Sequence, residues 1–171
     1  MSARVPEPHL SAWRAVLNAH ASLVGRIEQA LANAGLPPLA WYDVLWAVRR
    51  APGRQVRMAE LADGLTLSRG GVTKLVDRLE AAGLLRRERA EDDGRGFYAA
   101  LTDAGEEMLR RMWPVYARTL RETFVDTVSN EEAAVISAGL ERAKDAAASL
   151  PAQQPLSNRP GQRGGTQRAP D

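Results

Sequence analysis

The chain has 171 residues, enough for one domain with a hydrophobic core, and its 44% apolar and 26% charged residues are typical of a globular protein. It has no cysteine, which excludes disulfides, thiolate metal sites and cysteine nucleophiles. The sequence contains no membrane-length apolar run and no signal-peptide pattern, so a cytoplasmic location and no membrane partner are expected. Because the net charge is only +2, the positions of the arginines decide whether nucleic acid is a plausible partner.

The N-terminal region predicts two helices. The first carries apolar residues spaced alternately three and four apart, and it ends at Asn33-Ala34-Gly35, ahead of Pro37 and Pro38. The second covers residues 41–50 and ends at Ala51-Pro52-Gly53. The apolar stripe of the first helix consists of Leu10, Trp13, Leu17, His20, Val24, Ile27 and Leu31.

A short helix over residues 58–64, a turn and a second helix follow. Ser68 is the expected N-cap of that second helix, and Gly83 is its expected left-handed C-terminal residue. Residues 84–90 and 96–101 predict two strands of a hairpin, with a polar tip at 91–95. The buried face expected for the helix after Ser68 consists of Val72, Leu75, Val76 and Leu79.

The C-terminal part predicts two more helices and a tail. The first begins at Thr102 or Asp103, runs to about residue 128, and should kink at Pro114. Ser129 and Glu132 form a capping box at the start of the last helix. Residues 150–171 are rich in Pro, Gly, Gln and Arg, a composition that predicts disorder.

This order of elements predicts a mostly α fold with a small β-hairpin (α+β), a winged helix-turn-helix with flanking dimerisation helices. Residues 1–8 are expected to be a flexible N-terminus, and 9–149 a single domain. Within that domain, residues 38–102 form the winged helix-turn-helix lobe. The dimerisation helices fall in 9–35 and 103–149, since their stripes need a surface to pack on.

The segment 58–105 closely resembles the MarR family of bacterial transcription regulators. The matching residues are Glu60-Leu61-Ala62, Leu67-Ser68, Thr73, Val76-Asp77-Arg78-Leu79-Glu80, Gly83-Leu84, Asp93-x-Arg95 and Leu101-Thr102-x-x-Gly105. Gly94 replaces the arginine more usual in the middle of the wing motif. The resemblance extends over roughly residues 9–149.

The resemblance implies a homodimeric, sequence-specific DNA-binding regulator that binds a palindromic operator. It also implies that the protein represses a nearby operon, and that a small aromatic or phenolic ligand releases the protein from the operator. Helix period independently places a polar face opposite the apolar one, and such a helix fits the major groove. At the wing tip, Arg95 would enter the minor groove and Asp93 would orient it. The expected recognition-helix residues are Ser68, Arg69, Gly70, Thr73, Lys74 and Arg78.

A ligand pocket is expected between the dimer helices and the DNA-binding lobe, as the resemblance implies. Asp43 and Arg87 are included because they resemble the urate-responsive branch of the family, from which Leu75 departs. An alternative to a ligand pocket is that these aromatic residues, which lie on helical stripes, simply form part of the core. In the same way, His20 could be a hydrogen-bonded interface residue and not a ligand-binding one. The candidate pocket residues are Trp13, His20, Trp41, Asp43, Trp46, Arg87 and Trp113.

Two other classes of function remain as alternatives. A winged-helix module used only for protein association would lack DNA binding, although Arg69, Lys74 and Arg78 argue against it. An enzyme would need a nucleophile–base motif, metal-ligand spacing or a phosphate loop, and the sequence offers none of these. No cofactor, metal site or catalytic residue is therefore expected.

Overall fold

The structure is a computed structural model that describes residues 4–64, 69–89 and 96–150. The chain divides into two compact units, and the division falls between Val128 and Ser129 in the sequence. The elements of the first unit are α1 (Glu7–Asn33), α2 (Leu39–Arg50), a 3₁₀ turn (Pro52–Arg54), β1 (Gln55–Arg57), α3 (Met58–Gly64), α4 (Arg69–Ala81), β2 (Leu85–Arg89), β3 (Phe97–Leu101), α5 (Asp103–Leu120) and a π-helical turn (Arg121–Val125). The second unit contains α6 (Asn130–Ser149).

Several sequence-based predictions fall outside the described residues. They are Ser68, the wing tip with Asp93 and Arg95, and the tail from residue 151 onward. The predicted hairpin strands are confirmed as β2 and β3, each slightly shorter than expected. Among the helices that the structure describes, none is both long and apolar enough to cross a bilayer.

Helix α4 buries the apolar face that its sequence predicts. Val72, Val76 and Leu79 are fully buried and Leu75 is nearly so. They join a core shared with α1, α2, α3, the sheet and α5. The helix ends before Gly83, whose φ of +72° is the left-handed conformation expected there. One face of α4 is thereby fixed against the core, and the opposite face is left on the surface.

The sheet has three antiparallel strands in the order β1-β3-β2. The hairpin partners β2 and β3 pair Leu85 with Leu101 and Arg89 with Phe97. Strand β1, which the sequence did not predict, pairs Val56 with Ala99. Strand β3 is therefore the central strand of the sheet and is hydrogen-bonded to a neighbouring strand on each side.

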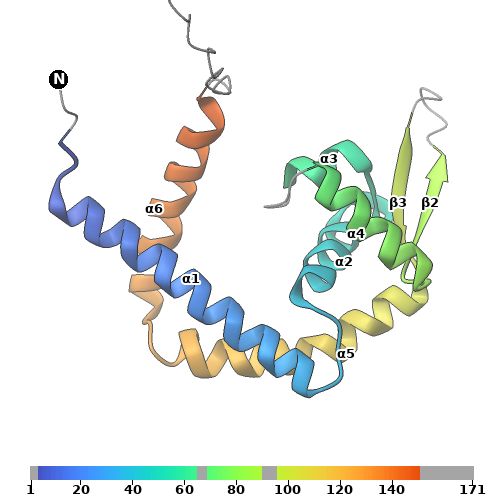
Figure 1. Cartoon of the computed structure of the whole chain (residues 1–171), viewed down its shortest axis with the longest axis horizontal. Coiled ribbons are helices and arrows are strands. Elements are labelled where there is room, and N and C mark those ends of the chain that lie inside the picture. Colours follow the sequence, from blue (N-terminus) through green and yellow to red (C-terminus); the bar gives the residue numbers. More distant parts are fainter. Residues whose placement is uncertain (1–3, 65–68, 90–95, 151–171) are drawn as a thin grey trace, which may run out of the picture. The chain divides into compact units, whose positions relative to one another are not determined.

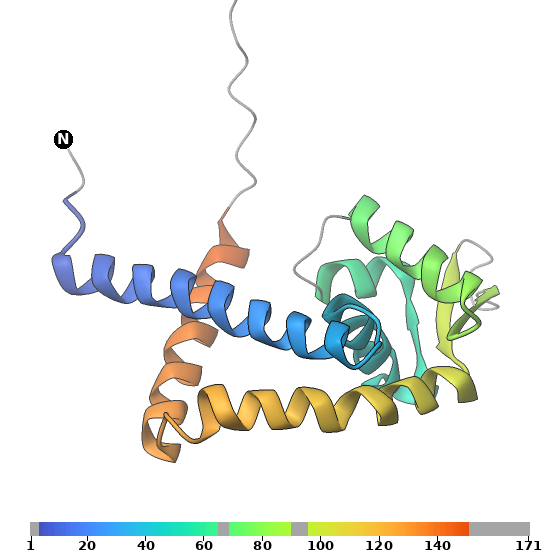
Figure 2. The same cartoon turned by 60° about the horizontal axis from the view of Figure 1, so that its bottom comes forward.

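The C-terminal half of helix α1 lies against α5 (Figures 1 and 2). In the second half of α1, the side chains of Ile27 and Leu31 are buried in the hydrophobic core. In the first half, Trp13 is 59% exposed and Leu17 50% exposed. The predicted stripe on α1 is thus buried at its C-terminal end and uncovered at its N-terminal end.

Helix α5 begins where the sequence predicts and ends earlier than predicted. Thr102 is its N-cap, accepting a hydrogen bond from the backbone N–H of Gly105. The α-helical hydrogen bonding continues past Pro114 to Leu120, and the π-helical turn follows. The hydroxyls of Thr119 and Thr123 donate to the carbonyls of Val115 and Thr119, four residues back and both in α5.

The second unit consists of α6 and its caps. Ser129 and Glu132 form the predicted capping box, with the Ser129 hydroxyl accepting from the Glu132 N–H and the Glu132 carboxylate accepting from the Ser129 N–H. This contact lowers the pKa of the Glu132 carboxyl. The described part of α6 has no buried residue, and its large exposed apolar side chains are Val135, Ile136 and Leu140.

Candidate functional site

The exposed face of α4 carries the residues predicted to read DNA. Gly70, Thr73, Lys74 and Arg78 are all exposed, on the side opposite the buried apolar face. Arg69 is the first residue of α4, and its side chain lies outside the described part. The structure therefore brings four of the six predicted recognition-helix residues onto one accessible surface.

An arginine from the wing holds this helix in place. Two guanidinium nitrogens of Arg87 on β2 lie 2.5 Å from the Asp77 carboxylate and 2.8 Å from that of Glu80. The backbone N–H of Arg87 also donates to Glu80, at 3.1 Å. Both acids lie on α4, so one residue of the wing links its strand to the helix through three hydrogen bonds.

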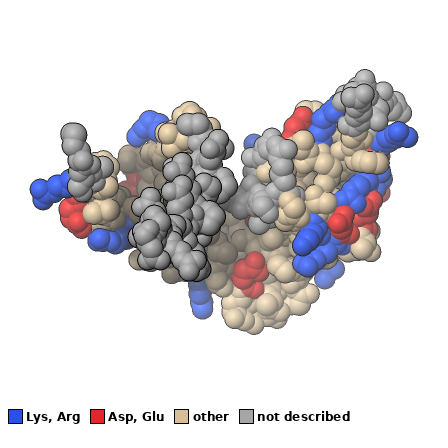
Figure 3. Space-filling model, turned by 45° about the horizontal axis from the view of Figure 1, so that its top comes forward, with Lys and Arg blue, Asp and Glu red and all other residues tan. Residues whose placement is uncertain are grey.

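Charges of both signs lie next to one another over the lobe that carries α4 and the sheet (Figure 3). This pattern matches the pairing of Arg87 with two acids and of Arg86 with Glu88. Lys74 and Arg78, in contrast, have no ion pair with any described residue. Among the described residues of α4, these two cations remain available to a polyanion.

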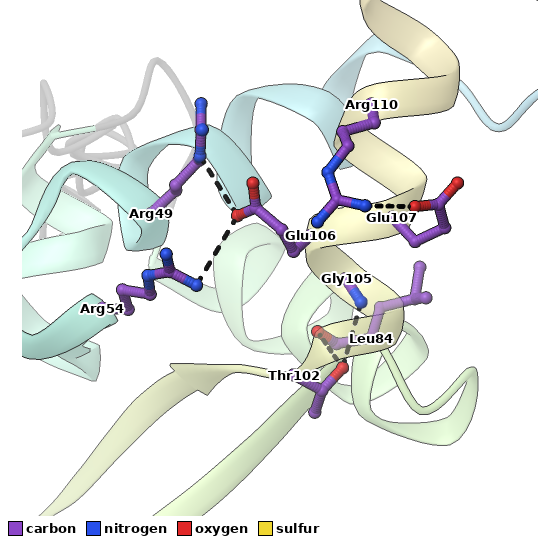
Figure 4. A network of polar contacts seen from close by, with 8 residues as sticks. All are labelled: Arg49, Arg54, Leu84, Thr102, Gly105, Glu106, Glu107 and Arg110. Atoms are coloured by element: carbon purple, nitrogen blue, oxygen red, sulfur yellow. Dashed lines mark hydrogen bonds and ion pairs between the residues drawn. The ribbon is translucent and has the colours of Figure 1, made fainter.

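A polar junction fixes α5 to α2, as Figure 4 shows. Glu106 is 7% exposed, and its carboxylate lies 3.1 Å from Nε of Arg49 and 3.9 Å from a guanidinium nitrogen of Arg54. Glu107, one residue further along α5, pairs with Arg110. A buried carboxylate needs such partners because desolvation penalises its charge. Glu106 therefore joins the start of α5 to the end of α2 and the turn after it.

The same end of α5 also packs closely on the turn before β2. The Thr102 hydroxyl donates to the carbonyls of Gly83 and Leu84. A Cβ added at Gly105 would lie 2.2 Å from the Leu84 carbonyl oxygen, which no real contact allows. Glycine is thus required at position 105 for close approach of the two backbones (Figure 4).

Beside this junction is a cavity of about 240 Å³ between α2 and α5. Three of its seven lining residues are aromatic, and the Tyr42 ring centroid lies 6.1 Å from that of Trp46 and 6.4 Å from that of Trp113. The Arg49 guanidinium lies over the Trp46 ring, 5.2 Å from its centroid. The lining residues are Tyr42, Trp46, Arg49, Glu106, Leu109, Arg110 and Trp113.

Burial perturbs the titratable groups around this aromatic cluster. Desolvation raises the pKa of the Tyr42 hydroxyl, with Tyr116 adding to the effect and Arg49 opposing it. Desolvation also raises the pKa of the Tyr116 hydroxyl and, with help from the charge of Glu28, that of the Asp43 carboxyl. Both phenols therefore remain protonated at neutral pH and can donate hydrogen bonds.

Of the seven candidate pocket residues, the cavity brings together Trp46 and Trp113. The other five, Trp13, His20, Trp41, Asp43 and Arg87, do not line it. Trp13 and His20 are exposed on α1, and Trp41 packs partly buried against the core.

Sequence reasoning missed the polar lining residues of the cavity. Arg49 follows Trp46 by three positions on the same face of α2, a spacing that could have identified it. No local pattern indicates Glu106, because its partner Arg49 lies 57 residues earlier in the chain.

Comparisons with known proteins agree with this geometry. A family model described as the MarR family matches residues 34–96. The HTH-type transcriptional regulator YkoM of Bacillus subtilis (strain 168), described as uncharacterised, is 34% identical over 76 residues, which cover 44% of this chain and 49% of that protein. The chain thus matches about half the length of this curated relative.

Two solved structures cover most of the chain. AbsC, a MarR family transcriptional regulator from Streptomyces coelicolor, has a TM-score of 0.78 and 27% identity, covering 87% of this chain and 100% of that one. Sco3205, a MarR family regulator from the same organism solved in complex with DNA, has a TM-score of 0.77 and 27% identity, covering 91% and 97%. With its winged helix-turn-helix between long flanking helices, this chain resembles the MarR family in sequence over residues 34–96 and in fold over most of its length.

Proposed function

We propose that the chain is a sequence-specific DNA-binding transcription regulator that acts as a homodimer. The exposed polar face of α4, with Thr73, Lys74 and Arg78 on a helix anchored by its other face, is the observation that carries this proposal. An α-helix fits the major groove of B-DNA, where side chains near its N-terminus read base edges. The similarity to Sco3205, which was solved in complex with DNA, supports the same role.

Each part of this surface has a distinct task in the proposal. Thr73 and Lys74, near the start of α4, contact bases, and Arg78, one turn later, contacts a phosphate. Gly70 lets the helix backbone come close to the DNA because it carries no side chain. Ser68, Arg69, Asp93 and Arg95, whose side chains lie outside the described part of the chain, stay predicted from the sequence to contact DNA as well.

The apolar side chains left exposed support dimerisation. Trp13 and Leu17 on α1, and Ile136 and Leu140 on α6, are each at least 41% exposed although they belong to helical apolar stripes. Exposed apolar patches on helices that flank a DNA-binding lobe favour burial against a second copy. A two-fold dimer would present two α4 helices about 34 Å apart, which requires a palindromic operator.

The aromatic cavity supports control by a small ligand. Its volume of about 240 Å³ accommodates a single-ring aromatic acid. Trp46 and Trp113 would stack on the ring, while Arg49 would pair with the carboxylate. Because α2 belongs to the DNA-binding lobe and α5 is a flanking helix, such a ligand would alter the angle between them and release the repressor from its operator.

The DNA proposal is tested by fluorescence anisotropy with DNA from the gene's own upstream region over a range of salt concentrations. The logarithm of the affinity should fall with the logarithm of salt by about 0.9 for each phosphate neutralised. The chain's two lysines provide a matched pair, since Lys74 lies on α4 and Lys144 on α6. Lys74→Ala should weaken binding and alter base preference, and Lys144→Ala should do neither.

The outcome also separates the alternatives. If the folded protein bound no DNA at low salt, the protein-association module would replace the regulator. A reporter gene placed behind the bound promoter distinguishes repression from activation, and analytical ultracentrifugation measures whether the protein is a dimer.

Titration with benzoate, followed by intrinsic tryptophan fluorescence, tests ligand binding in the aromatic cavity. Trp113→Phe is expected to remove much of the fluorescence response.

A further inference from the structure

A second, polar cleft of about 350 Å³ lies between α1 and the end of α5 with the π-helical turn. Arg26, Gln29 and Asn33 line it from α1, and Arg118 and Glu122 line it from the other side. It shares no residue with the aromatic cavity or with the exposed face of α4. Whatever this cleft binds is therefore recognised separately from operator DNA and from an aromatic ligand.

Two arginines face this cleft without a counter-ion. Within the described part of the chain, Arg26 and Arg118 form no ion pair and no side-chain hydrogen bond, whereas Arg14, Arg49 and Arg87 each pair with a carboxylate. A guanidinium carries five N–H donors and stays charged at any physiological pH. The guanidinium groups of Arg26 and Arg118 therefore give this concave surface unpaired positive charge and unused hydrogen-bond donors.

The remaining polar groups of the cleft refine the chemistry. Nε2 of Gln29 donates to Oδ1 of Asn33 at 2.9 Å, so the amide N–H₂ of Asn33 is left as a further donor. The hydroxyls of Thr119 and Thr123 already donate to backbone carbonyls. Glu122 contributes one negative charge, which leaves the cleft with a formal charge of +1.

We propose that this cleft binds a small oxyanion carrying carboxylate or phosphate groups. Arg26 and Arg118 would bind its oxygens from opposite walls, and Asn33 would donate a third hydrogen bond. The π-helical turn that supplies Glu122 and Thr123 supports a binding role, because such turns often occur at functional sites. A bound anion would connect α1 to α5 within the first unit.

The test is isothermal titration calorimetry of the full chain with inorganic phosphate and, separately, with succinate, each at constant ionic strength set by sodium chloride. Arg26→Gln and Arg118→Gln should each lower the affinity about tenfold or more, because each removes a charge-assisted contact. Arg121→Gln is the matched control, since Arg121 is exposed three positions further along and does not line the cleft. Glu122→Gln should strengthen binding several-fold by removing a like charge.

Circular dichroism of each variant confirms that it is folded, as expected for substitutions at exposed positions. Comparing phosphate with succinate identifies which oxyanion the cleft prefers. The proposal is overturned if the binding heat does not saturate with either anion. It is also overturned if Arg118→Gln and Arg121→Gln bind the anion with equal affinity. Operator affinity should be the same in Arg118→Gln and the wild type. A loss there would instead assign this arginine to a DNA phosphate and overturn the small-anion site.

Discussion

The guanidinium of Arg87 lies 2.5 Å from the carboxylate of Asp77, which joins the wing strand β2 to the proposed recognition helix α4. Arg87 is 27% exposed and Asp77 53%, so solvent weakens the ion pair. Its value to the protein is therefore partly positional. It fixes α4 against the wing, and it neutralises an acid on the helix that would approach the DNA phosphates.

Replacing Arg87 should lower the stability of the folded protein. Arg87→Ala removes both side-chain hydrogen bonds, and the free energy of unfolding should fall by about 1–2 kcal/mol. Arg86→Ala is the control, since Arg86 is 59% exposed and pairs within its own strand, so that change should cost less than about 0.5 kcal/mol. Urea unfolding measures both free energies, and equal effects of the two substitutions would contradict a stabilising role for the contacts of Arg87 with Asp77 and Glu80.

The contact at Gly105 should tolerate no side chain. Gly105→Ala places a Cβ against the Leu84 carbonyl, and relieving the clash by moving backbone should cost about 3 kcal/mol of unfolding free energy. Gly25→Ala is the control, because nothing lies within 4 Å of its added Cβ in α1. There alanine should stabilise the helix by up to about 1 kcal/mol. Thermal and urea unfolding of both variants should therefore shift in opposite directions.

Gly70 should show a conflict between stability and function. An added Cβ meets nothing within 4 Å in the protein, so Gly70→Ala should raise the free energy of unfolding by up to about 1 kcal/mol. If the helix backbone approaches DNA there, the same methyl group should lower operator affinity at least several-fold. Anisotropy and urea unfolding measure the two effects. Unchanged affinity in the stabilised variant would exclude close backbone approach at this position.

Asp43 should make stability depend on pH. Its folded-state pKa is raised above the ordinary value of 3.8 by desolvation and by Glu28, so the folded protein holds this proton more tightly than the unfolded chain does. Stability from this group is therefore present at low pH and lost as pH rises through the raised pKa. Asp43→Asn should be more stable than the wild type at pH 7, with the difference closing below about pH 4. A constant difference from pH 3 to pH 7 would contradict this assignment.

Periodic patterns within one element were predictable from the sequence. The buried face of α4 follows from the 3.6-residue period, and the capping box of Ser129 and Glu132 follows from residue types three positions apart. Strand β1 was missed because three residues carry no measurable alternation, and its pairing with β3 arises only in the folded lobe.

Contacts between distant elements were not predictable. Arg87 was expected near a ligand because of the family resemblance, yet the structure places its side chain against Asp77 and Glu80. The cavity depends on α2 meeting α5, so Arg49 and Glu106 become neighbours only through tertiary packing. Helical period correctly grouped the stripe of α1 but could not say that Trp13 would remain uncovered within one chain.

The position of β3 between β1 and β2 has a consequence for redesign of this lobe. A hairpin that projected from a self-sufficient helix-turn-helix could be shortened or exchanged as a separate module. Here β3 is also the pairing partner of β1, the segment that leads into α3. Grafting a foreign wing to change operator preference must therefore preserve the sequence from Phe97 to Leu101, because replacing that strand would also disturb its pairing with β1.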